Sequence, residues 1–371
     1  MKYEDFLQLE PYKVSRLQKR KILTEVLKVL TREHIKNCPE YEKMLSALGV
    51  TGQTVDLITD YNQLPFIPVR LFKEFELCSV PKENVVKIMT SSGTTGQQVS
   101  KIFLDKETSS AQSKIMTRIV SDFIGNSRLP MIILDTSAIL KNRNMFSARG
   151  AGILGFSMFG RDRVYALDEN MELDVAGLTT FLEKHKGENI FLFGFTFMIW
   201  QHFYKKLFEN KVKLDLSKGI LIHGGGWKKL ASEAVSPEQF KTSLNNICGI
   251  KNIYNYYGMV EQTGTIYMEC EYGHLHASTF SDVIIRNPDD WSECKQGKKG
   301  LIEVVSCLPK SYPGHCLLTE DEGIIDGEDD CPCGRKGSYF RILGRIKNAE
   351  IRGCSDTYAD KFTKKITSDR G

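Results

Sequence analysis

The hydrophobic pattern of the first 75 residues is typical of helices. Between residues 13 and 48, apolar side chains recur at the spacing of one buried helix face. That spacing is made by Leu17, Ile22, Leu23, Val26, Leu27 and Leu30. The stretch LPFIPVRLF then places Pro65 and Pro68 where a helix does not continue. We therefore predict a helical N-terminal segment over residues 1–75.

Short apolar runs alternate with helix-like stretches between residues 85 and 265. The runs with strand character are NVVKIM, PMIILDTS, NIFLFGF, GILIHGGG and KNIYNYYG. Two stretches between them, LTTFLEKHK and TFMIWQHFYKKLFEN, have helical character. Such alternation favours an α/β core with a largely parallel, buried sheet, which we place at residues 76–275. Polar or Gly-rich loops follow several strands, at the end where such sheets bind ligands.

The pattern changes after residue 275. The runs SDVIIRN, GLIEVVSC, HCLLTEDEG and SYFRILGR are short and separated by turns. They predict a smaller β-rich subdomain over residues 276–345, followed by a short C-terminal tail over residues 346–371. The fold class expected is α/β, with a large core of mostly parallel sheet.

Composition and charge narrow the classes of function. A formal net charge of +4, from 50 basic and 46 acidic side chains, gives no electrostatic case for a nucleic-acid partner. No apolar run is long enough for a transmembrane helix, and the charged N-terminus lacks the apolar segment of a signal peptide. We therefore expect a cytoplasmic protein whose ten cysteines are reduced.

The stretch TSSGTTGQQ is the first candidate for ligand binding. It follows a strand-like run, and its hydroxyls and backbone N–H groups could surround an anion, although it lacks the Lys-Ser/Thr pair of a Walker loop. The alternative is a polar surface turn. The residues expected to hold phosphate are Ser91, Ser92, Gly93, Thr94, Thr95 and Gly96.

Two later motifs supply complementary chemistry. In HGGGW, successive glycines allow the backbone to approach a flat ligand closely. In YYGMVEQTG, Glu261 is a natural Mg²⁺ ligand, because Mg²⁺ prefers hard oxygens. A flexible turn and a surface carboxylate are the alternatives. The residues singled out in these two motifs are Gly224, Gly225, Gly226, Tyr257, Gly258 and Glu261.

Charged residues near the C-terminal end complete the set. Asp321 in LLTEDEG could accept hydrogen bonds from ribose hydroxyls. In RILGRIKNAEIRG, Arg341 and Arg345 are cations able to meet phosphate or carboxylate.

In this order and spacing, the motifs resemble those of the acyl-adenylate-forming superfamily. The resemblance implies that Ser91–Gly96 is the phosphate loop and that Gly224–Gly226 lies on the adenine side. It also implies that Glu261 closes a Tyr-Gly-x-x-Glu motif, that Asp321 binds ribose, and that Gly344-Arg345 is the Gly-Arg hinge segment. The implied cofactors are ATP and Mg²⁺.

Two branches of the superfamily compete. The runs TSSGTTG, FLFGFTFMIW, IHGGGWK, SYPGHCLLTEDEGII and IRGC resemble the LuxE-type acyl-protein synthetases, the activating subunits of fatty acid reductase complexes in luminous bacteria. The runs CPCGR and MEC…LH resemble the phenylacetate–CoA ligases. The first resemblance implies activation of a carboxylic acid, expected to be a fatty acid, to acyl-AMP. The alternatives are an acyl- or aryl-CoA ligase and a non-catalytic nucleotide-binding module.

The C-terminal region departs from the wider superfamily. Other adenylating ligases continue past the Gly-Arg segment into a mobile domain that carries a lysine and admits coenzyme A, and here we expect that domain to be absent or vestigial. The LuxE-type resemblance places an acyl-carrying cysteine in the tail, at Cys354. Arg352 lies two residues away and would favour the thiolate; an ordinary exposed cysteine is the alternative. The acyl group would pass on to a partner acyl reductase or acyltransferase.

A separate set of residues has the chemistry of a metal site. Cys-x-Cys at Cys331 and Cys333, with Cys270 and His276, could supply four ligands to a structural Zn²⁺. His274 could replace His276. The alternative is four unrelated core or turn residues.

Overall fold

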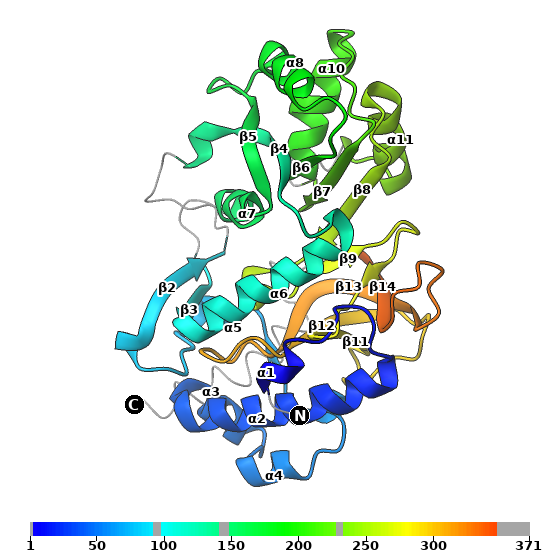
Figure 1. Cartoon of the computed structure of the whole chain (residues 1–371). Helices are drawn as coiled ribbons and strands as arrows, with labels where there is room; N and C mark the ends of the chain where they lie inside the picture. The colour runs from blue at the N-terminus through cyan, green and yellow to red at the C-terminus, as the bar shows by residue number, and fades with distance from the viewer. Residues whose placement is uncertain (1–2, 92–97, 141–147, 228–232, 347–371) are drawn as a thin grey trace. The chain divides into compact units, whose positions relative to one another are not determined.

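The computed structural model describes residues 3–91, 98–140, 148–227 and 233–346 (Figure 1). The chain divides into two compact units. The first comprises residues 1–119, 258–267 and 272–371, and the second comprises residues 120–257 and 268–271. Each unit has its own sheet architecture.

A parallel sheet forms the centre of the second unit. Its strands are β4 (Leu129–Thr136), β5 (Gly160–Leu167), β6 (Ile190–Phe195), β7 (Gly219–Gly224) and β8 (Asn252–Tyr257). They lie in the order β8-β7-β6-β4-β5, and each neighbouring pair is parallel. Every residue of β6 is buried, as expected for a strand covered on both faces.

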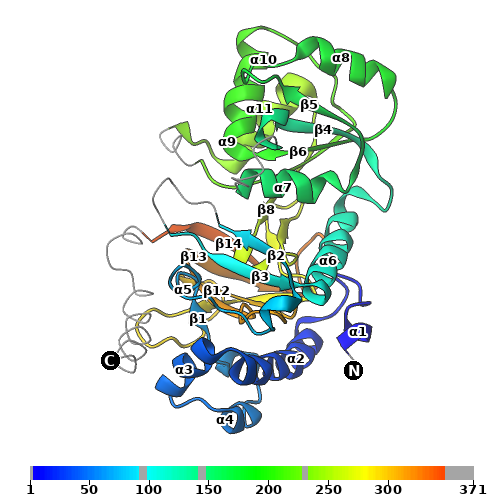
Figure 2. The ribbon, with the colours of Figure 1, turned by 90° about the vertical axis from the view of Figure 1, so that its left-hand side faces the viewer.

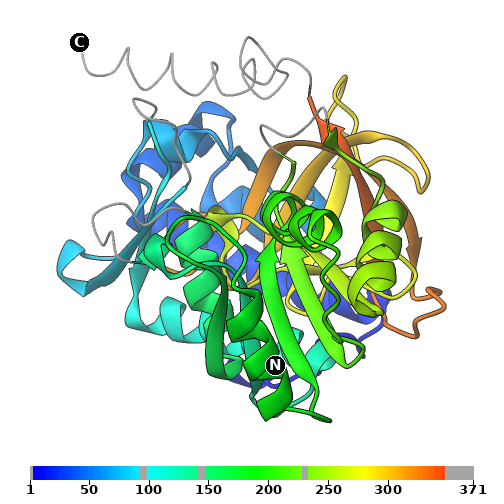
Figure 3. The same cartoon turned by 90° about the horizontal axis from the view of Figure 1, so that it is seen from above.

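Helices connect the parallel strands (Figure 3). They are α7 (Ala148–Ser157), α8 (Val175–Lys184), the consecutive segments α9 (Thr196–Met198), η4 (Ile199–Tyr204) and α10 (Lys205–Glu209), and α11 (Pro237–Cys248). Segment η4 is a π-helix. The chain passes from β4 outward to β5 and then returns to β6 on the other side of β4. The carboxyl ends of β4 and β6 therefore flank a topological switch point, where open α/β sheets bind ligands.

The first unit contains an antiparallel sheet. Its strands, in spatial order, are β11 (Ser281–Arg286), β12 (Gly300–Ser306), β13 (Cys316–Glu328), β14 (Ser338–Arg345) and β10 (Leu275–His276). Strand β1 (Ile67–Pro68) pairs in parallel with β13. Strand β9 (Tyr267–Glu269) precedes β10 along the chain. The four runs predicted as strands after residue 275 correspond to β11, β12, β13 and β14.

A separate hairpin in the first unit corrects one expectation. Strands β2 (Val85–Thr90) and β3 (Lys101–Asp105) pair only with each other and are antiparallel. The run NVVKIM is thus a strand, but the prediction that it is buried in a parallel sheet is wrong. Val86 is 62% exposed and Ile88 is 55% exposed. The β-branched residues give this run its strand propensity, whereas its burial depends on packing that the run itself does not encode.

Helices make up the remainder of the first unit. They are α1 (Tyr3–Phe6), α2 (Arg16–Asn37), α3 (Pro39–Ala47), α4 (Gly52–Asp56), η1 (Tyr61–Gln63), α5 (Leu71–Glu74), η2 (Lys82–Asn84) and α6 (Lys106–Ile124), which continues into the second unit. Helix α2 begins after Ser15, whose side chain accepts a hydrogen bond from the backbone N–H of Gln18. It ends before Pro39, the first residue of α3.

The buried face of α2 differs in one respect from the prediction. Leu23, Leu27 and Leu30 are buried as expected, but Leu17 is 67% exposed. In the same turns, Arg16 and Lys19 are buried and contact the carboxylate of Asp282 on β11 at 3.1 Å and 3.2 Å. Figure 2 shows α2 alongside the strands of this sheet. The first part of α2 therefore packs against the sheet through Arg16 and Lys19, which pair with Asp282, and not through the apolar residue Leu17.

None of the helices in the described ranges combines the length and the apolar character that a membrane span requires.

Candidate active site and metal centre

Glu261 lies in a rigid turn of the first unit. The turn η6 (Val260–Gln262) is held by the side chain of Gln262, whose Nε2 donates to the carbonyl oxygens of Val304 at 3.0 Å and Gly314 at 2.8 Å. A Cβ at Gly314 would lie 2.8 Å from the Glu261 carbonyl oxygen, so only glycine fits there without a shift. These contacts of Gln262 and Gly314 hold the backbone of the turn in place.

Glu261 is buried, with 6% of its surface exposed. Burial raises its pKa, and the negative charge of Glu320 acts in the same direction. Interaction with the Ser100 hydroxyl and the positive charge of Lys73 act in the opposite direction. Burial removes the water that would stabilise the carboxylate charge, and a bound divalent cation would stabilise it instead. Glu261 therefore has the surroundings that suit the expected Mg²⁺ ligand.

The base of the expected phosphate loop lies close to Glu261. Ser91 and Ser100 close it, because the Ser100 backbone N–H donates to Ser91 Oγ at 2.9 Å and the Ser91 N–H donates to the Ser100 carbonyl at 3.2 Å. The other five loop residues lie outside the described residues; they are Ser92, Gly93, Thr94, Thr95 and Gly96. The loop joins two antiparallel strands, β2 and β3, rather than a strand and a helix.

Strands β13 and β14 carry the expected ribose and hinge residues. Asp321 is directly opposite Arg345 in the register of this strand pair. Arg345 forms an ion pair with Glu320, the residue whose charge acts on Glu261. Arg341 is instead engaged with Asp326, with nitrogen–oxygen distances of 2.8–3.0 Å.

Two of the groups that act on the Glu261 pKa belong to these elements: Ser100 closes the base of the loop, and Glu320 is the ion-pair partner of Arg345. Gly258 is exposed just before the Glu261 turn.

The glycine-rich segment and Tyr257 lie in the second unit. Gly224 packs against Tyr256, since a Cβ on Gly224 would lie 2.4 Å from Tyr256 Cε1. Gly225 has φ +76°, and a Cβ there would lie 3.2 Å from Phe195. A Cβ on Gly226 would meet nothing within 4 Å. Only Gly226 therefore borders open space, whereas Gly224 and Gly225 are glycines for reasons of packing and backbone conformation.

His223, next to these glycines, is a satisfied structural histidine. Its Nδ1 lies 2.9 Å from Thr196 Oγ1, and the Thr196 hydroxyl is also 3.2 Å from the Gly224 carbonyl oxygen. Burial lowers the pKa of His223 to about 3, and the charge of Lys241 adds to this effect. The ring is therefore neutral and holds the ends of β6 and β7 together.

The switch point contains a buried ion pair that the sequence analysis missed. Asp135, at the end of β4, is fully buried, and its Oδ2 lies 3.0 Å from Arg149 Nε on α7. Burial raises the pKa of Asp135, and Arg149 lowers it. The sequence does contain a sign of Asp135, since the apolar run PMIIL is followed directly by this carboxylate. Lys73 and Ser100 were missed as well, and no local pattern distinguishes them.

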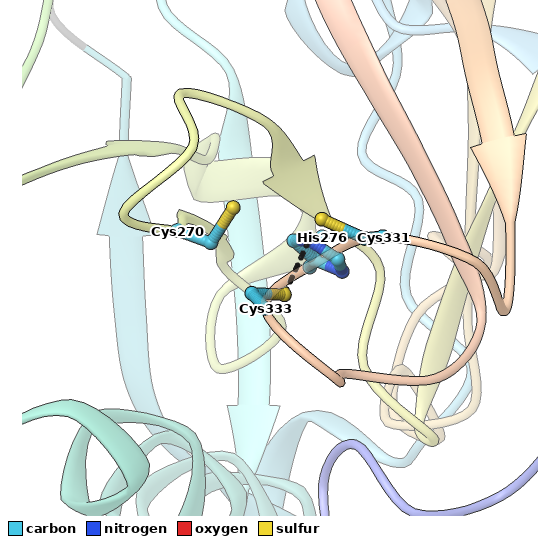
Figure 4. Close-up of side chains that lie close together, drawn as sticks. All are labelled: Cys270, His276, Cys331 and Cys333. Carbon is cyan, nitrogen blue, oxygen red and sulfur yellow. Dashed lines mark hydrogen bonds between the residues drawn. The ribbon is translucent and has the colours of Figure 1, made fainter.

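Four ligand-bearing side chains converge at a second place (Figure 4). Cys270, His276, Cys331 and Cys333 each offer one ligand atom, and these four atoms all lie within 4.8 Å of one another. None of these three cysteines forms a disulfide, and Cys270 and Cys331 are buried whereas Cys333 is partly exposed. His274 is not in this group, but its Nδ1 lies 3.4 Å from Cys331 Sγ. The expected acyl acceptor, Cys354, lies outside the described residues.

Solved structures similar to this chain define its class. A 2-hydroxyisobutyryl-CoA ligase in an open conformation superposes with a TM-score of 0.67 and 15% identity, over 91% of this chain and 72% of that one. The same ligase in its thioesterification state gives a TM-score of 0.69 and 16% identity, over 91% and 70%. The predicted α/β fold with a mostly parallel sheet is confirmed. The chain has the fold of the acyl-adenylate-forming ligases.

Sequence comparisons identify the family. Residues 3–363 match the family model described as acyl-protein synthetase, LuxE. The chain belongs to this family, as its motifs indicated, and it is an adenylate-forming ligase that activates an acid with ATP.

Two individual relatives match most of the chain, and a third, with a different name, matches a shorter part of it. A long-chain-fatty-acid–luciferin-component ligase of Vibrio harveyi is 24% identical over 362 residues, covering 94% of this chain and 90% of its own length. The protein of the same name from Aliivibrio fischeri is 21% identical over 84% of this chain and 82% of its own. A phenylacetate-coenzyme A ligase of Aromatoleum evansii is 33% identical over 93 residues, 24% of this chain and 21% of its own.

Proposed function

We propose that this enzyme activates a long-chain fatty acid as acyl-AMP, transfers the acyl group to its own Cys354, and passes it to a partner acyl reductase. The observation that carries the proposal is the family match over residues 3–363, supported by two relatives named as long-chain-fatty-acid–luciferin-component ligases. The fold similarity supports the first half-reaction, because it extends to adenylate-forming ligases.

The first step joins two anions, and the residues of the first unit suit that task. A carboxylate oxygen attacks the α-phosphate of ATP, an oxygen–phosphorus bond forms, and pyrophosphate leaves. Backbone N–H groups and hydroxyls of Ser91–Gly96 would hold the phosphates, and Arg345 would offset their charge. Glu261 would hold Mg²⁺, which screens the phosphate charge when bound. Asp321 would accept hydrogen bonds from ribose hydroxyls.

The second step would use the thiolate of Cys354. It attacks the acyl carbonyl of acyl-AMP, a carbon–sulfur bond forms, and AMP leaves with the electron pair of the broken carbon–oxygen bond. The resulting thioester keeps the acyl group activated for a reductase, which must supply the electrons that convert it to an aldehyde.

A second candidate acceptor is coenzyme A. The 33% identity to a phenylacetate-coenzyme A ligase favours it, although that match covers only 24% of this chain. A CoA ligase would release its product instead of retaining it on the protein.

Two assays test the proposal. ATP–pyrophosphate exchange, screened over acids of increasing chain length, should be strongest with long-chain fatty acids. With radiolabelled acid and ATP, wild-type protein should retain label that neutral hydroxylamine releases, as it does from a thioester. The variant Cys354→Ser should keep the exchange activity and lose the labile label.

Each contrary outcome has a distinct meaning. Wild-type labelling of Cys354→Ser would place the thioester elsewhere. Product formation that depends on coenzyme A, with no labelled protein, would support the CoA ligase instead. Absence of exchange with every acid tested would contradict the substrate class.

A further inference from the structure

We propose that Cys270, His276, Cys331 and Cys333 bind one Zn²⁺ ion that clips the turn between β13 and β14 to the segment that joins β9 and β10. The site is separate from the residues assigned to adenylation, and it would be structural, because four protein ligands leave no open coordination position.

The geometry of the four ligand atoms suits tetrahedral zinc. Zn–S bonds of about 2.3 Å and Zn–N bonds of about 2.0 Å place neighbouring ligand atoms of a tetrahedron roughly 3.5–3.8 Å apart. All four ligand atoms lie within 4.8 Å of one another. His276 Nε2, the ring nitrogen that faces the sulfurs, is 3.4 Å from Cys333 Sγ. A contraction of less than about an ångström would therefore complete the site.

Two of the three sulfurs, those of Cys331 and Cys333, have nitrogen atoms as close neighbours. His274 Nδ1 lies 3.4 Å from Cys331 Sγ, and the backbone N–H of Arg335 donates to Cys333 Sγ at 3.5 Å. A backbone N–H donor such as that of Arg335 would stabilise a metal-bound sulfur and orient it. His276 is fully buried and stacks on Tyr339, with ring centroids 5.5 Å apart, which fixes the plane of the imidazole.

The turn that carries two of the ligands is already shaped as a knuckle. The N–H of Gly334 donates to the Cys331 carbonyl at 2.9 Å, and Gly334 has φ +80°. The Asp329 carboxylate accepts from the N–H of Gly337 at 2.8 Å and from that of Arg16 on α2 at 2.9 Å. The two thiols are thus presented on one side of a constrained loop, so little backbone entropy remains to be lost when a metal binds.

A bound zinc ion would affect strands β13 and β14, which flank the turn that carries Cys331 and Cys333. Cys333 and His276 are 57 residues apart in the sequence, and the metal would cross-link them. Strand β13 carries Asp321 and β14 carries Arg345, which face each other in register. Zinc at one end of this strand pair would therefore stabilise the register that places the two residues opposite each other at the other end.

Elemental analysis of the untagged full-length protein tests the proposal directly. After dialysis against metal-free buffer, we expect about one zinc per chain. Cys333→Ser and His276→Gln should lose most of it, whereas His276→Cys should retain it, because a fourth thiolate can replace the imidazole. Cys294→Ser is the matched control, since Cys294 is a partly exposed cysteine outside the group, and its zinc content should equal that of the wild type.

Thermal unfolding of the same proteins gives a second readout. Zinc-depleted wild type and Cys333→Ser should unfold at a lower temperature than the zinc-loaded wild type, and added zinc should restore only the former. Circular dichroism separates a destabilised fold from a chain that did not fold. Purified protein that contains no zinc, or another metal in its place, overturns the proposal, as does unchanged unfolding after depletion. Zinc content is measured without ATP, so its outcome is independent of the proposed reaction.

Discussion

A methyl group added at Gly226 tests where ATP lies relative to the glycine-rich segment. We propose from the resemblance that the adenine side of the nucleotide runs along Gly224–Gly226. In the structure, only Gly226 borders space that is free of described atoms within 4 Å of a new Cβ. Gly226→Ala therefore adds a group that the protein tolerates and a bound nucleotide would meet.

The expected magnitudes follow from these contacts. A surface-type substitution with no new clash changes stability by about 0.5 kcal/mol or less. A methyl group forced into a close-packed contact costs about 1–3 kcal/mol. If the adenine packs on Gly226, that cost falls on ATP binding, and it corresponds to roughly 5- to 150-fold weaker binding.

The matched variant is Gly224→Ala, in which the added methyl group would clash with the Tyr256 ring of the protein. Its Cβ would lie 2.4 Å from Cε1 and 2.7 Å from Cζ of Tyr256, so the cost of about 1–3 kcal/mol should appear as lost stability. The pair therefore separates an effect on the ligand from an effect on the fold.

The assay is ATP–pyrophosphate exchange at saturating fatty acid, with ATP varied, together with thermal unfolding. Gly226→Ala should raise the apparent KM for ATP and leave the unfolding temperature and the KM for the acid unchanged. Gly224→Ala should lower the unfolding temperature. A Gly226→Ala enzyme with a wild-type KM for ATP would refute the adenine placement, because the added methyl group has nowhere else to act.

Two further predictions concern buried ionisable groups. Glu261→Gln should lower pyrophosphate exchange by on the order of 10²-fold with little change in stability, because it removes a charge and not a core contact. Exchange at a nearly wild-type rate would contradict the role of Glu261 as a Mg²⁺ ligand. Burial lowers the pKa of His34 to about 4 and that of His223 to about 3, below the usual 6.5. The unfolded chain therefore binds protons first as pH falls, so this stabilisation is complete above pH 6.5 and is lost as pH falls toward these values. Urea unfolding between pH 6.5 and 5 should show a smaller loss of stability for His34→Gln than for wild type; identical pH profiles would contradict the assignment.

The sequence by itself determined most of the secondary structure and the types of functional side chain that are present. Buried runs such as NIFLFGF and GILIHGGG became parallel strands β6 and β7, because a continuous apolar run is stable only where both faces of a strand are covered. Leu23, Leu27 and Leu30 gave the period of α2 and are buried as expected. These features are local: each depends on the residues of one segment and on the backbone geometry of that segment.

Only the tertiary structure decided which strands pair with each other and which charged side chains are buried together. The run NVVKIM carries strand propensity, but its antiparallel pairing and its exposure follow from its one partner, β3. Arg16 and Lys19 are buried because Asp282, more than 260 residues away in the sequence, lies opposite them and compensates their charge. Without that partner, burial of either cation would be strongly unfavourable, so no helical pattern could have predicted it.

The metal site shows both contributions together. The sequence supplied the ligand types and the Cys-x-Cys spacing of Cys331 and Cys333, yet the same four residues were also compatible with unrelated core or turn positions. Only the folded chain brings Cys270 and His276 to within 4.8 Å of that pair and selects His276 over His274 for the group. The physical reason is that ligand identity is a property of single residues. A coordination site is instead a property of distances between segments that are far apart in the sequence, and only the folded chain determines those distances.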